Sequence, residues 1–334
     1  MNTVMNKFEI SVVICTCNRA GMIAQAVQSV LDQSVPDQIN YEVVVIDDGS
    51  TDHTGDVVKR MIAAGNQSKL RYVYKTGGGV ADARNFGVKE AAGAWIAFFD
   101  DDQLAEPQWL SALYQVIQEK NAKCVGGSLS LLLPDGFDLD LGPKSRRVLG
   151  ERNFGDEVRK YDDNEDSVPG TGNVLFDKQL FVQLNGFDTN MREGAEDTDF
   201  FSRMRGLGHD IWYTPGAHAH HVIPESRANL DFIRWVTTKS GVAWARIQYK
   251  RRGSKQLLLT SLSRLVASVV RDLPLSLWSF LSRNYALKTD CLCTSNFTVG
   301  YIRGSLHFLS PNLFKQKKFM EFVDFRRHGG ERKN

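Results

Sequence analysis

The sequence of 334 residues predicts an α/β fold with a mostly parallel, Rossmann-like sheet flanked by helices, followed by a helical C-terminal extension. Three observations lead to this fold class. Apolar, β-branched runs recur before residue 100, stretches with helical periodicity separate them, and the balance of charge reverses in the last third of the chain. Runs that are apolar on both faces are typical of strands in a covered parallel sheet.

The expected strands are residues 10–16, 41–46, 70–74 and 94–99. Helices are expected between them, over residues 20–31, 52–64 and 80–92. This alternation predicts right-handed crossovers between parallel strands. Ligands bind such sheets at the carboxyl ends of the strands, so the polar residues that follow each apolar run are the candidates for a site.

The next part of the chain is more irregular. We expect a helix over residues 107–120, with Pro107 in its first turn, and a strand near 123–130. Residues 134–167 are polar and rich in turn formers, which indicates a long surface excursion. A strand and a short helix follow within residues 168–188, then a helix near 196–206 and a strand near 209–213.

Charge divides the chain into two predicted domains. Residues 1–226 contain 21 Lys and Arg against 33 Asp and Glu, a balance of −12, whereas residues 227–334 contain 20 against 6, a balance of +14. An acidic part suits metal ions, and a basic, apolar part suits an anionic surface of lipid or nucleic acid. Five cysteines without a disulfide spacing, and no signal-like run before the first strand, lead us to expect the reducing cytoplasm.

Residues 257–273 have the period of an amphipathic helix, with Arg264, Arg271 and Asp272 on the polar side. The two arginines, and Pro274 after them, argue against a membrane span, which needs roughly 20 mostly uncharged residues. We expect this helix to lie in the interface of an anionic membrane; the alternative is a helix packed on the first domain. The expected further anchors are Trp278, Phe280, Tyr285, Lys315, Lys317 and Lys318.

Three carboxylates, Asp100, Asp101 and Asp102, follow the fourth apolar run directly. Adjacent like charges repel, so a cation is expected among them. In extended backbone Asp100 and Asp102 face the same way while Asp101 turns aside, which predicts a site for Mg²⁺ or Mn²⁺. The run "GGGVADAR" has no Gly-Lys-Ser/Thr and carries Asp82 where a dinucleotide motif needs glycine, which excludes both common phosphate loops.

Six motifs together resemble one known family over about residues 8 to 225. In order they are "VVICTCNRAGMIAQAVQSVLDQS", "YEVVVIDDGSTDHT", "GGGVADARNFGVKEAAGAWIAFFDDDQ", "GTGNVLF", "LNGFD" and "EDTDFFSR". The set is similar to the family 2 inverting glycosyltransferases, which have the GT-A fold. Each motif alone is moderately specific, and the order of all six supports the resemblance.

The resemblance implies a set of donor-binding residues at the strand ends. Within it, Asp48 holds the base of a nucleotide sugar, Asp100 reaches the ribose, and Arg84 lies near the diphosphate or braces the acids. The complete set is Thr16, Asn18, Asp48, Arg84, Asp100 and Asp101.

The resemblance also implies a metal site and a catalytic base. Asp102 binds the metal, and a histidine of "PGAHAHHVIPESR" completes the site; motif spacing favours His221 over His218 and His220. Asp197 of "EDTDF" is the catalytic base. A divalent ion offsets the charge of the leaving nucleoside diphosphate, and a carboxylate on the opposite face of the sugar takes the acceptor's proton.

We therefore expect a metal-dependent inverting glycosyltransferase that uses a UDP-, GDP- or dTDP-linked donor and a glycan or lipid-linked acceptor. Its expected setting is cell-surface polysaccharide synthesis on the cytoplasmic, inner face of the cell membrane, with no nucleic-acid partner. Two alternatives remain open: a sugar-nucleotide nucleotidyltransferase, and a non-catalytic module that binds nucleotide sugars or glycans. The first alternative should have a glycine-rich basic loop after the first strand, where "CNRAGM" stands, and the second would have no need of Asp197.

Overall fold

The computed structural model describes residues 8–66, 68–162, 168–191 and 196–314. The described residues form two compact units. The first contains those up to Leu132, from Glu151 to Met191 and from Glu196 to Val222, and the second contains those from Leu133 to Gly150 and from Ile223 onward. The expected boundary after residue 226 stays a prediction.

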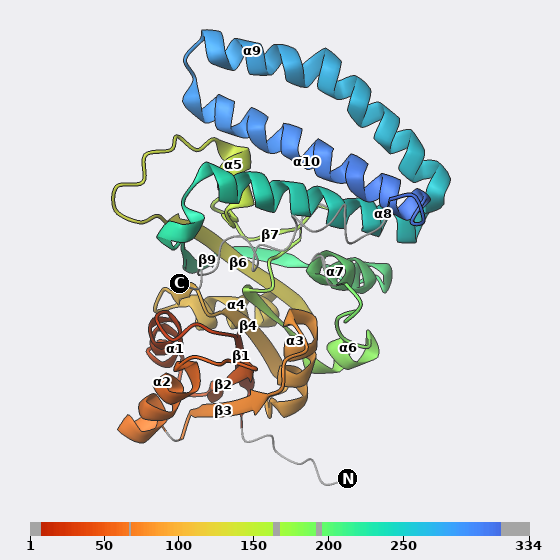
Figure 1. Ribbon diagram of the computed structural model, residues 1–334. Helices are drawn as coiled ribbons and strands as arrows, with labels where there is room; N and C mark the ends of the chain where they lie inside the picture. Colours follow the sequence, from red (N-terminus) through yellow and green to blue (C-terminus); the bar gives the residue numbers. More distant parts are fainter. Residues whose placement is uncertain (1–7, 67, 163–167, 192–195, 315–334) are drawn as a thin grey trace. The chain divides into compact units, whose positions relative to one another are not determined.

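One mixed sheet forms the centre of the first unit (Figure 1). Its strands are ordered β3-β2-β1-β4-β8-β6-β9-β5, and β7 pairs with β9. The first four, β1 (Ile10–Thr16), β2 (Tyr41–Asp48), β3 (Leu70–Lys75) and β4 (Trp95–Asp100), pair in parallel, as their apolar sequences predict. Their carboxyl ends therefore meet at one edge of the sheet.

The other half of the sheet mixes directions. Strand β8 (Asn173–Asp177) is antiparallel to β4 and to β6 (Cys124–Leu132), and β6 is parallel to β9 (Trp212–Val222). The short strands β5 (Gln103–Ala105) and β7 (Arg159–Lys160) are antiparallel to β9. The expected parallel arrangement is thus confirmed for the first four strands and gives way to mixed pairing beyond β4.

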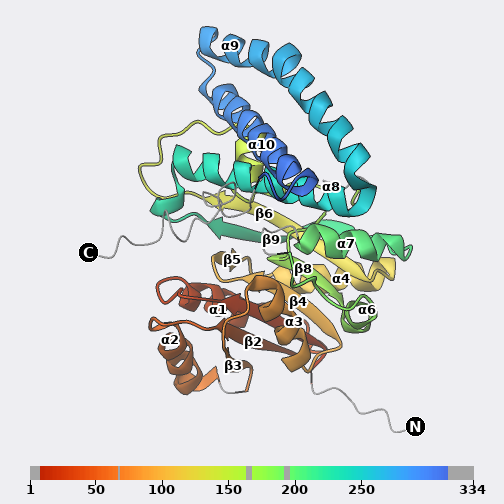
Figure 2. The same ribbon diagram turned by 45° about the vertical axis from the view of Figure 1, so that its right-hand side comes forward.

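Helices cover both faces of this sheet (Figure 2). On one face α1 (Ile23–Leu31), α2 (Thr54–Met61) and α4 (Trp109–Lys120) share a hydrophobic core with the strands. On the other face α3 (Val80–Glu90), α6 (Lys178–Gln183) and α7 (Glu196–Gly206) form a second core. A short π-helical turn, η1 (Ile62–Asn66), follows α2.

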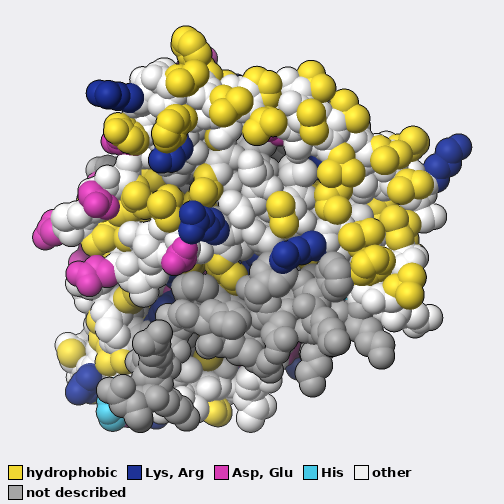
Figure 3. Space-filling view, turned by 45° about the horizontal axis from the view of Figure 1, so that its top comes forward, with side chains coloured by type: hydrophobic (Ala, Val, Ile, Leu, Met, Phe, Trp, Pro, Cys, Tyr) yellow, Lys and Arg dark blue, Asp and Glu magenta, His cyan; other side chains and the backbone are white. Residues whose placement is uncertain are grey.

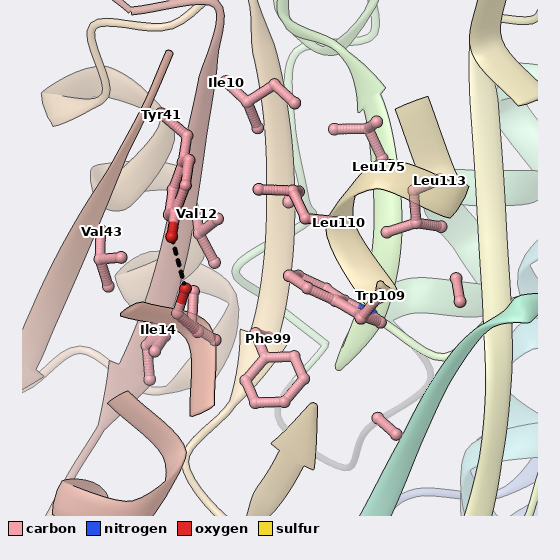
Figure 4. Packing of buried hydrophobic residues seen from close by; sticks show 14 of the residues in the cluster. Ile10, Val12, Ile14, Tyr41, Val43, Phe99, Trp109, Leu110, Leu113 and Leu175 are labelled. Atoms are coloured by element: carbon pink, nitrogen blue, oxygen red, sulfur yellow. Dashed lines mark hydrogen bonds between the residues drawn. The ribbon is translucent and has the colours of Figure 1, made fainter. Parts of the chain in front are cut away.

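The first of these cores fixes the end of β4, on which the acidic motif stands (Figure 4). Phe99 packs edge-on against Trp109 with ring centroids 4.8 Å apart, and the indole Nε1 donates to Oδ1 of Asn173 at 2.8 Å. At the other side of the core, the Tyr41 hydroxyl donates to the carbonyl of Val30 at 2.9 Å. The acidic residues that follow Phe99 therefore extend from a rigid support.

The second unit is helical. It contains α5 (Pro143–Val148), η2 (Glu225–Arg227), α8 (Leu230–Ala267), η3 (Ser268–Asp272), α9 (Leu273–Leu281) and α10 (Tyr285–Leu309). A Cβ on Gly241 or Gly300 would overlap backbone atoms of the partner helix, so α8 and α10 pack at close range. Gly253 has a φ of 73°, where α8 turns back so that its second half leads to η3 and α9 (Figures 1 and 2).

Several expected elements differ from the observed ones. Strand β9 is much longer than the expected strand near 209–213 and contains all three histidines of the cluster. The excursion 134–167 includes α5 and β7, and its residues 163–167 lie outside the described part of the chain. Pro274 occupies the first turn of α9, where its missing N–H is tolerated, so it does not end the helical run.

Candidate active site

Asp47 and Asp48 end β2 and organise the loops around it. Asp47 accepts hydrogen bonds from the Ser50 amide at 2.8 Å and from the Tyr72 hydroxyl at 2.7 Å. The Asp48 carboxylate accepts from the amides of Gly78 and Gly79, at 3.0 and 2.8 Å, and from Nζ of Lys75 at 3.2 Å. Asp48, expected at the nucleotide base, therefore also binds the glycine loop that precedes α3.

The end of β1 contacts the neighbouring loops in two directions. The Thr16 hydroxyl donates to Oδ2 of Asp101 at 2.7 Å, and Nε of Arg19 lies 3.7 Å from Oδ1 of the same carboxylate. Asn18, with a positive φ of 56°, accepts from the Thr51 amide at 2.8 Å. Thr16 and Asp101 thus pair with each other, and Asn18 joins the loop after β1 to the loop after β2.

Arg84 lies between two acidic segments that are distant in sequence. Its Nη1 donates to Glu196 at 2.8 Å, and its Nη2 is 3.4 Å from Oδ1 of Asp100. The side chains of Arg84 and Glu196 are each 9% exposed. Burial opposes the charge of Arg84, but the carboxylates of Asp100 and Glu196 prevail and raise its pKa. Arg84 therefore braces the acids, which is one of its two expected roles.

The pKa values of the acidic triplet reflect crowding of like charges. Loss of solvent raises the pKa of Asp100, and the neighbouring Asp102 adds to this shift while Arg84 opposes it. Burial, followed by the charge of Asp102, raises the pKa of Asp101 to about 7, against the opposing contacts of Thr16 and Arg19. A cation bound among these carboxylates would relieve the repulsion.

The directions of the three carboxylates differ from the extended-strand expectation. Strand β4 ends at Asp100, and Asp101 and Asp102 form the turn that leads into β5. Asp100 faces Arg84, Asp101 faces Thr16, and Asp102 faces His221. Asp101 does turn aside, but a turn rather than strand alternation separates it from its neighbours.

Asp102 and His221 form the candidate metal centre. The carboxylate Oδ1 of Asp102 lies 3.5 Å from Nε2 of His221, and the two side chains are 11% and 16% exposed. Two atoms each about 2.1 Å from one ion can lie up to about 4.2 Å apart, so this pair fits a shared Mg²⁺ or Mn²⁺. Across residues 8–66, 68–162, 168–191 and 196–314 no group of three or more His, Cys, Asp or Glu has metal-binding geometry. If this pair holds a cation, further ligands would be needed, and substrate and water can supply them.

The other two histidines of β9 belong to a separate hydrogen-bonded chain. His218 lies 2.7 Å from Oγ of Ser128 and 3.1 Å from Oγ of Ser130, and burial lowers its pKa. His220 lies 2.8 Å from the same Ser130 oxygen and 2.7 Å from Oε1 of Glu106. Of the three histidines, His221 is therefore the one placed against the acidic motif.

Asp197 lies in the first turn of α7, beside the Arg84 cluster. Its Oδ1 accepts from the Thr198 amide at 2.7 Å, and its charge contributes to raising the pKa of Arg84. Glu196 turns to Arg84, while Asp199 pairs with Arg203 at 2.8 Å. The three acids of this turn thus have different partners.

Two neighbours of Asp100 were not among the predicted site residues. Gln103 is buried and its Nε2 lies 3.5 Å from Oδ2 of Asp100, while its Oε1 has no hydrogen-bond partner in the described part of the chain. A Cβ on Gly172 would overlap the side chains of Asp100 and Gln103, so a larger residue there would have to displace them. The Gly-Thr-Gly run was visible in the sequence, but nothing local connects it to Asp100.

Comparisons with known proteins find relatives of this chain. The family model described as Glycosyl transferase family 2 matches residues 11–182. The chain is 25% identical over 244 residues to "Succinoglycan biosynthesis protein ExoM" of Rhizobium meliloti (strain 1021), covering 71% of this chain and 74% of that protein.

Two solved structures share the fold at 18% sequence identity each. One is "Mannosyltransferase PcManGT from Pyrobaculum calidifontis in complex with GDP-Man and Mn2+", with a TM-score of 0.58 over 89% of this chain and 87% of that one. The other is "Crystal structure of GalNAc-T7 with UDP, GalNAc and Mn2+", with a TM-score of 0.54 over 74% of this chain and 52% of that one. The chain thus spans about half of the second protein.

Proposed function

The chain belongs to glycosyl transferase family 2 and is a glycosyltransferase of the GT-A fold, and we propose that it transfers a sugar from a nucleotide-sugar donor with inversion and with bound Mn²⁺ or Mg²⁺. The proposed acceptor is a glycan or a lipid-linked saccharide in the synthesis of a cell-surface polysaccharide, as the name of the Rhizobium relative suggests. The observation that carries the proposal is the Asp102–His221 pair that follows β4, together with Arg84, which joins the acidic motif to the turn that contains Asp197.

The donor side of the proposal rests on the strand ends. The Asp48 carboxylate and the amides of the glycine loop that it binds lie at the carboxyl ends of the parallel strands. Nucleotides bind α/β sheets at this edge. The two similar structures contain UDP or GDP-mannose, which makes UDP- and GDP-linked sugars the first donors to test, followed by dTDP-linked sugars. Thr16, Asn18, Asp100 and Asp101 are the proposed neighbours of the nucleoside.

Asp102 and His221 are the proposed metal ligands from this chain. A bound Mn²⁺ or Mg²⁺ offsets the negative charge that develops on the leaving nucleoside diphosphate. Arg84 holds Asp100 and Glu196 in fixed positions around this centre, so the carboxylates do not have to reorganise when a donor arrives. The two similar structures are both described with Mn²⁺, which supports this metal.

Asp197 is the proposed general base. It stands in the first turn of α7, and its neighbour Glu196 is engaged by Arg84, so the two adjacent acids have separate roles. A single carboxylate that removes the acceptor's proton supports direct displacement with inversion. A double displacement would need a second carboxylate positioned as nucleophile.

The base can be tested without knowing the acceptor. UDP-glucose, UDP-N-acetylglucosamine, GDP-mannose and a dTDP-sugar are incubated with Mn²⁺, and release of the nucleoside diphosphate to water is measured. Asp197→Asn should lower this rate about 10²- to 10⁴-fold while nucleotide binding is kept. Asp199→Asn, which changes the nearby acid that pairs with Arg203, is the matched control. An unchanged rate in Asp197→Asn would remove the proposed base.

We also propose that the second unit binds an anionic membrane. In the described residues no helix is both long and apolar enough to cross a bilayer. Fourteen of the 24 exposed large hydrophobic side chains of the described part nevertheless lie between Leu258 and Tyr285, on α8, η3, α9 and the start of α10. Figure 3 shows such side chains gathered toward the top of the view, with Lys and Arg side chains beside them. A patch of this extent is typical of an interaction surface.

The orientation of the amphipathic run within the second unit favours binding to lipid. Its polar side is turned inward: Ser261 and Asp272 are buried, and the Arg264 guanidinium lies 4.9 and 4.6 Å from the ring centroids of Phe297 and Tyr301 on α10. Its apolar side is the exposed one, with Val269 and Val270 66% and 70% exposed.

The basic residues that flank this surface complete the argument. Residues 227–314 contain 13 Lys and Arg against 3 Asp and Glu, a balance that attracts anionic headgroups. The expected anchors Lys315, Lys317 and Lys318 lie outside the described residues. Arg264 and Arg271 are poor tests of lipid binding, because Arg264 packs on α10 and Nε of Arg271 binds Asp272 at 2.7 Å.

Vesicle sedimentation tests the membrane proposal. Wild type should sediment with phosphatidylcholine vesicles that contain phosphatidylglycerol, and combined serine substitutions of Val269, Val270, Phe280 and Leu281 should weaken binding at least about ten-fold. Serine at Val182 and Leu207, exposed hydrophobic residues of the first unit, is the control and should change nothing. The proposal would be contradicted if wild type never sediments with these vesicles. It would also be contradicted if the protein forms a dimer without lipid and the four serine substitutions dissociate that dimer.

A further inference from the structure

A polar cavity of about 310 Å³ lies in the first unit, against strands β6 and β9. Its walls come from Ser128 and Ser130 of β6, from Tyr213 and His218 of β9, and from the segment between Glu151 and Asp156. None of the residues proposed above for the donor, the metal or the catalytic base lines it. Its volume is at the lower end of the range for small-molecule sites, about 300–1,000 Å³, which suits one sugar unit.

The cavity lies on the face of the sheet that carries the catalytic base. Tyr213 belongs to the same hydrophobic core as Phe200 and Phe201 of α7, the helix that begins with Glu196 and Asp197. Along β9, His218 precedes the candidate metal ligand His221 by three residues, so the two side chains point to opposite faces of the strand. A ligand in the cavity would therefore lie on the face that carries α7 and Asp197, and not on the face of His221.

The floor of the cavity is fixed by hydrogen bonds within the protein. The Ser128 hydroxyl donates to the carbonyl of Pro215 at 3.0 Å and contacts Nδ1 of His218 at 2.7 Å. The ring of Tyr213 packs edge-on against Phe154 and Tyr161, with centroids 5.4 and 5.9 Å apart, and its hydroxyl donates to the Gly155 carbonyl at 3.2 Å. A floor held in this way needs little ordering when a ligand binds.

The rim combines hydrogen-bond donors and acceptors with a slightly acidic balance. Glu151 and Asp156 are acceptors, Arg152 is a donor, and the Asn153 amide can be both. Two carboxylates against one guanidinium disfavour a phosphate or another anion. Mixed donors and acceptors suit the hydroxyl groups of a neutral sugar.

We propose that this cavity binds a neutral pyranose unit of the acceptor. This inference rests on the proposed glycosyltransferase function and adds the place and the chemical class of the acceptor's bound unit. Asp156 and Asn153 are exposed on the rim, and the Asp156 carboxylate and the Asn153 side-chain N–H groups are available to sugar hydroxyls. Asn153 Oδ1 accepts from the Gly155 amide at 2.9 Å, and the buried Tyr213 supports the cavity from behind.

Saturation-transfer NMR tests the proposal with methyl glycosides of glucose, galactose, mannose and N-acetylglucosamine. Wild type with Mg²⁺, which is diamagnetic, and UDP or GDP should transfer saturation to at least one glycoside. The double variant Asp156→Asn, Asn153→Ala should weaken that binding about ten-fold, the effect of losing one or two hydrogen bonds. Asp37→Asn with Gln38→Ala, an exposed acid and amide elsewhere, is the matched control and should leave it unchanged. Thermal melting confirms that both double variants are folded, and Glu151→Gln serves as a second rim variant.

The outcomes separate this proposal from the function on which it rests. If wild type binds a nucleoside diphosphate with Mn²⁺ but none of the glycosides, the cavity proposal fails and the proposed function stands. If a glycoside binds equally to wild type and to all rim variants, the sugar lies elsewhere and the cavity proposal fails too. If no nucleoside diphosphate binds, the proposed function itself fails.

Discussion

Replacement of Arg84 by methionine should lower the stability of the first unit substantially. Arg84 and Glu196 are each 9% exposed and joined at 2.8 Å, whereas the contact of Arg84 with Asp100 is longer, at 3.4 Å. Removing the guanidinium leaves Glu196 as a buried charge without its cation, a loss of about 3–5 kcal/mol. At about 2–4 °C per kcal/mol for a domain of this size, the melting temperature should fall by roughly 6–20 °C.

A double-mutant cycle followed by thermal unfolding at neutral pH identifies the cause. Arg84→Met with Glu196→Met replaces the buried pair by apolar side chains, so it should recover much of the loss. Arg159→Met removes an exposed pair with Asp162 and should cost less than about 1 kcal/mol. The reasoning is refuted if Arg84→Met melts within about 2 °C of wild type, or if the double variant shows the sum of the two single losses.

Three further predictions concern other parts of the fold. Burial lowers the pKa of His218 below its ordinary value of 6.5, so the unfolded chain binds this proton more readily and stability is lost as the pH falls below about 6.5. Melting curves of His218→Gln should therefore show a weaker dependence of stability on pH. An equal pH dependence in wild type and variant would contradict this prediction. Gly172→Ala places a methyl group against Asp100 and Gln103. Calorimetry should show a loss of about 1–3 kcal/mol in the free energy of unfolding, together with weaker Mn²⁺-dependent nucleotide binding. Normal nucleotide binding would show that the packing of Gly172 against Asp100 is unimportant. Asp290 accepts hydrogen bonds from the Lys144 amide at 3.1 Å and from the Ser145 amide and hydroxyl at 2.8 Å. Asp290→Ala should therefore lower the free energy of unfolding of the second unit by about 2–4 kcal/mol, measured by urea unfolding. A change under about 0.5 kcal/mol would mean that other contacts hold α5.

The elements best predicted from the sequence are those whose pattern is local. The four apolar runs became β1 to β4, because a strand buried on both faces needs an uninterrupted apolar sequence. Helices α1 to α4 followed from their periodicity within a few residues at each end. The position of the acidic triplet at a strand's carboxyl end followed from the same pattern.

The parts that escaped prediction depend on distant contacts. Arg84 and Glu196 are 112 positions apart, and nothing near either residue signals the other. The long strand β9 was missed because glycine, proline and histidines interrupt its pattern, yet pairing with β6 and β5 holds them in the sheet. The inward direction of the polar side of α8 was hidden because helical periodicity separates two faces without saying which one is covered.

The central claim is that Asp102 and His221 hold a divalent cation together with a nucleoside diphosphate. Titration calorimetry of UDP, GDP and dTDP, each with and without Mn²⁺, tests this claim most directly. We predict that wild type binds at least one of them ten-fold or more tightly with Mn²⁺, that Asp102→Asn and His221→Ala lose this gain, and that His53→Ala, at an exposed histidine, keeps it. Equal affinities with and without the metal, or a gain that survives in Asp102→Asn, would contradict the account.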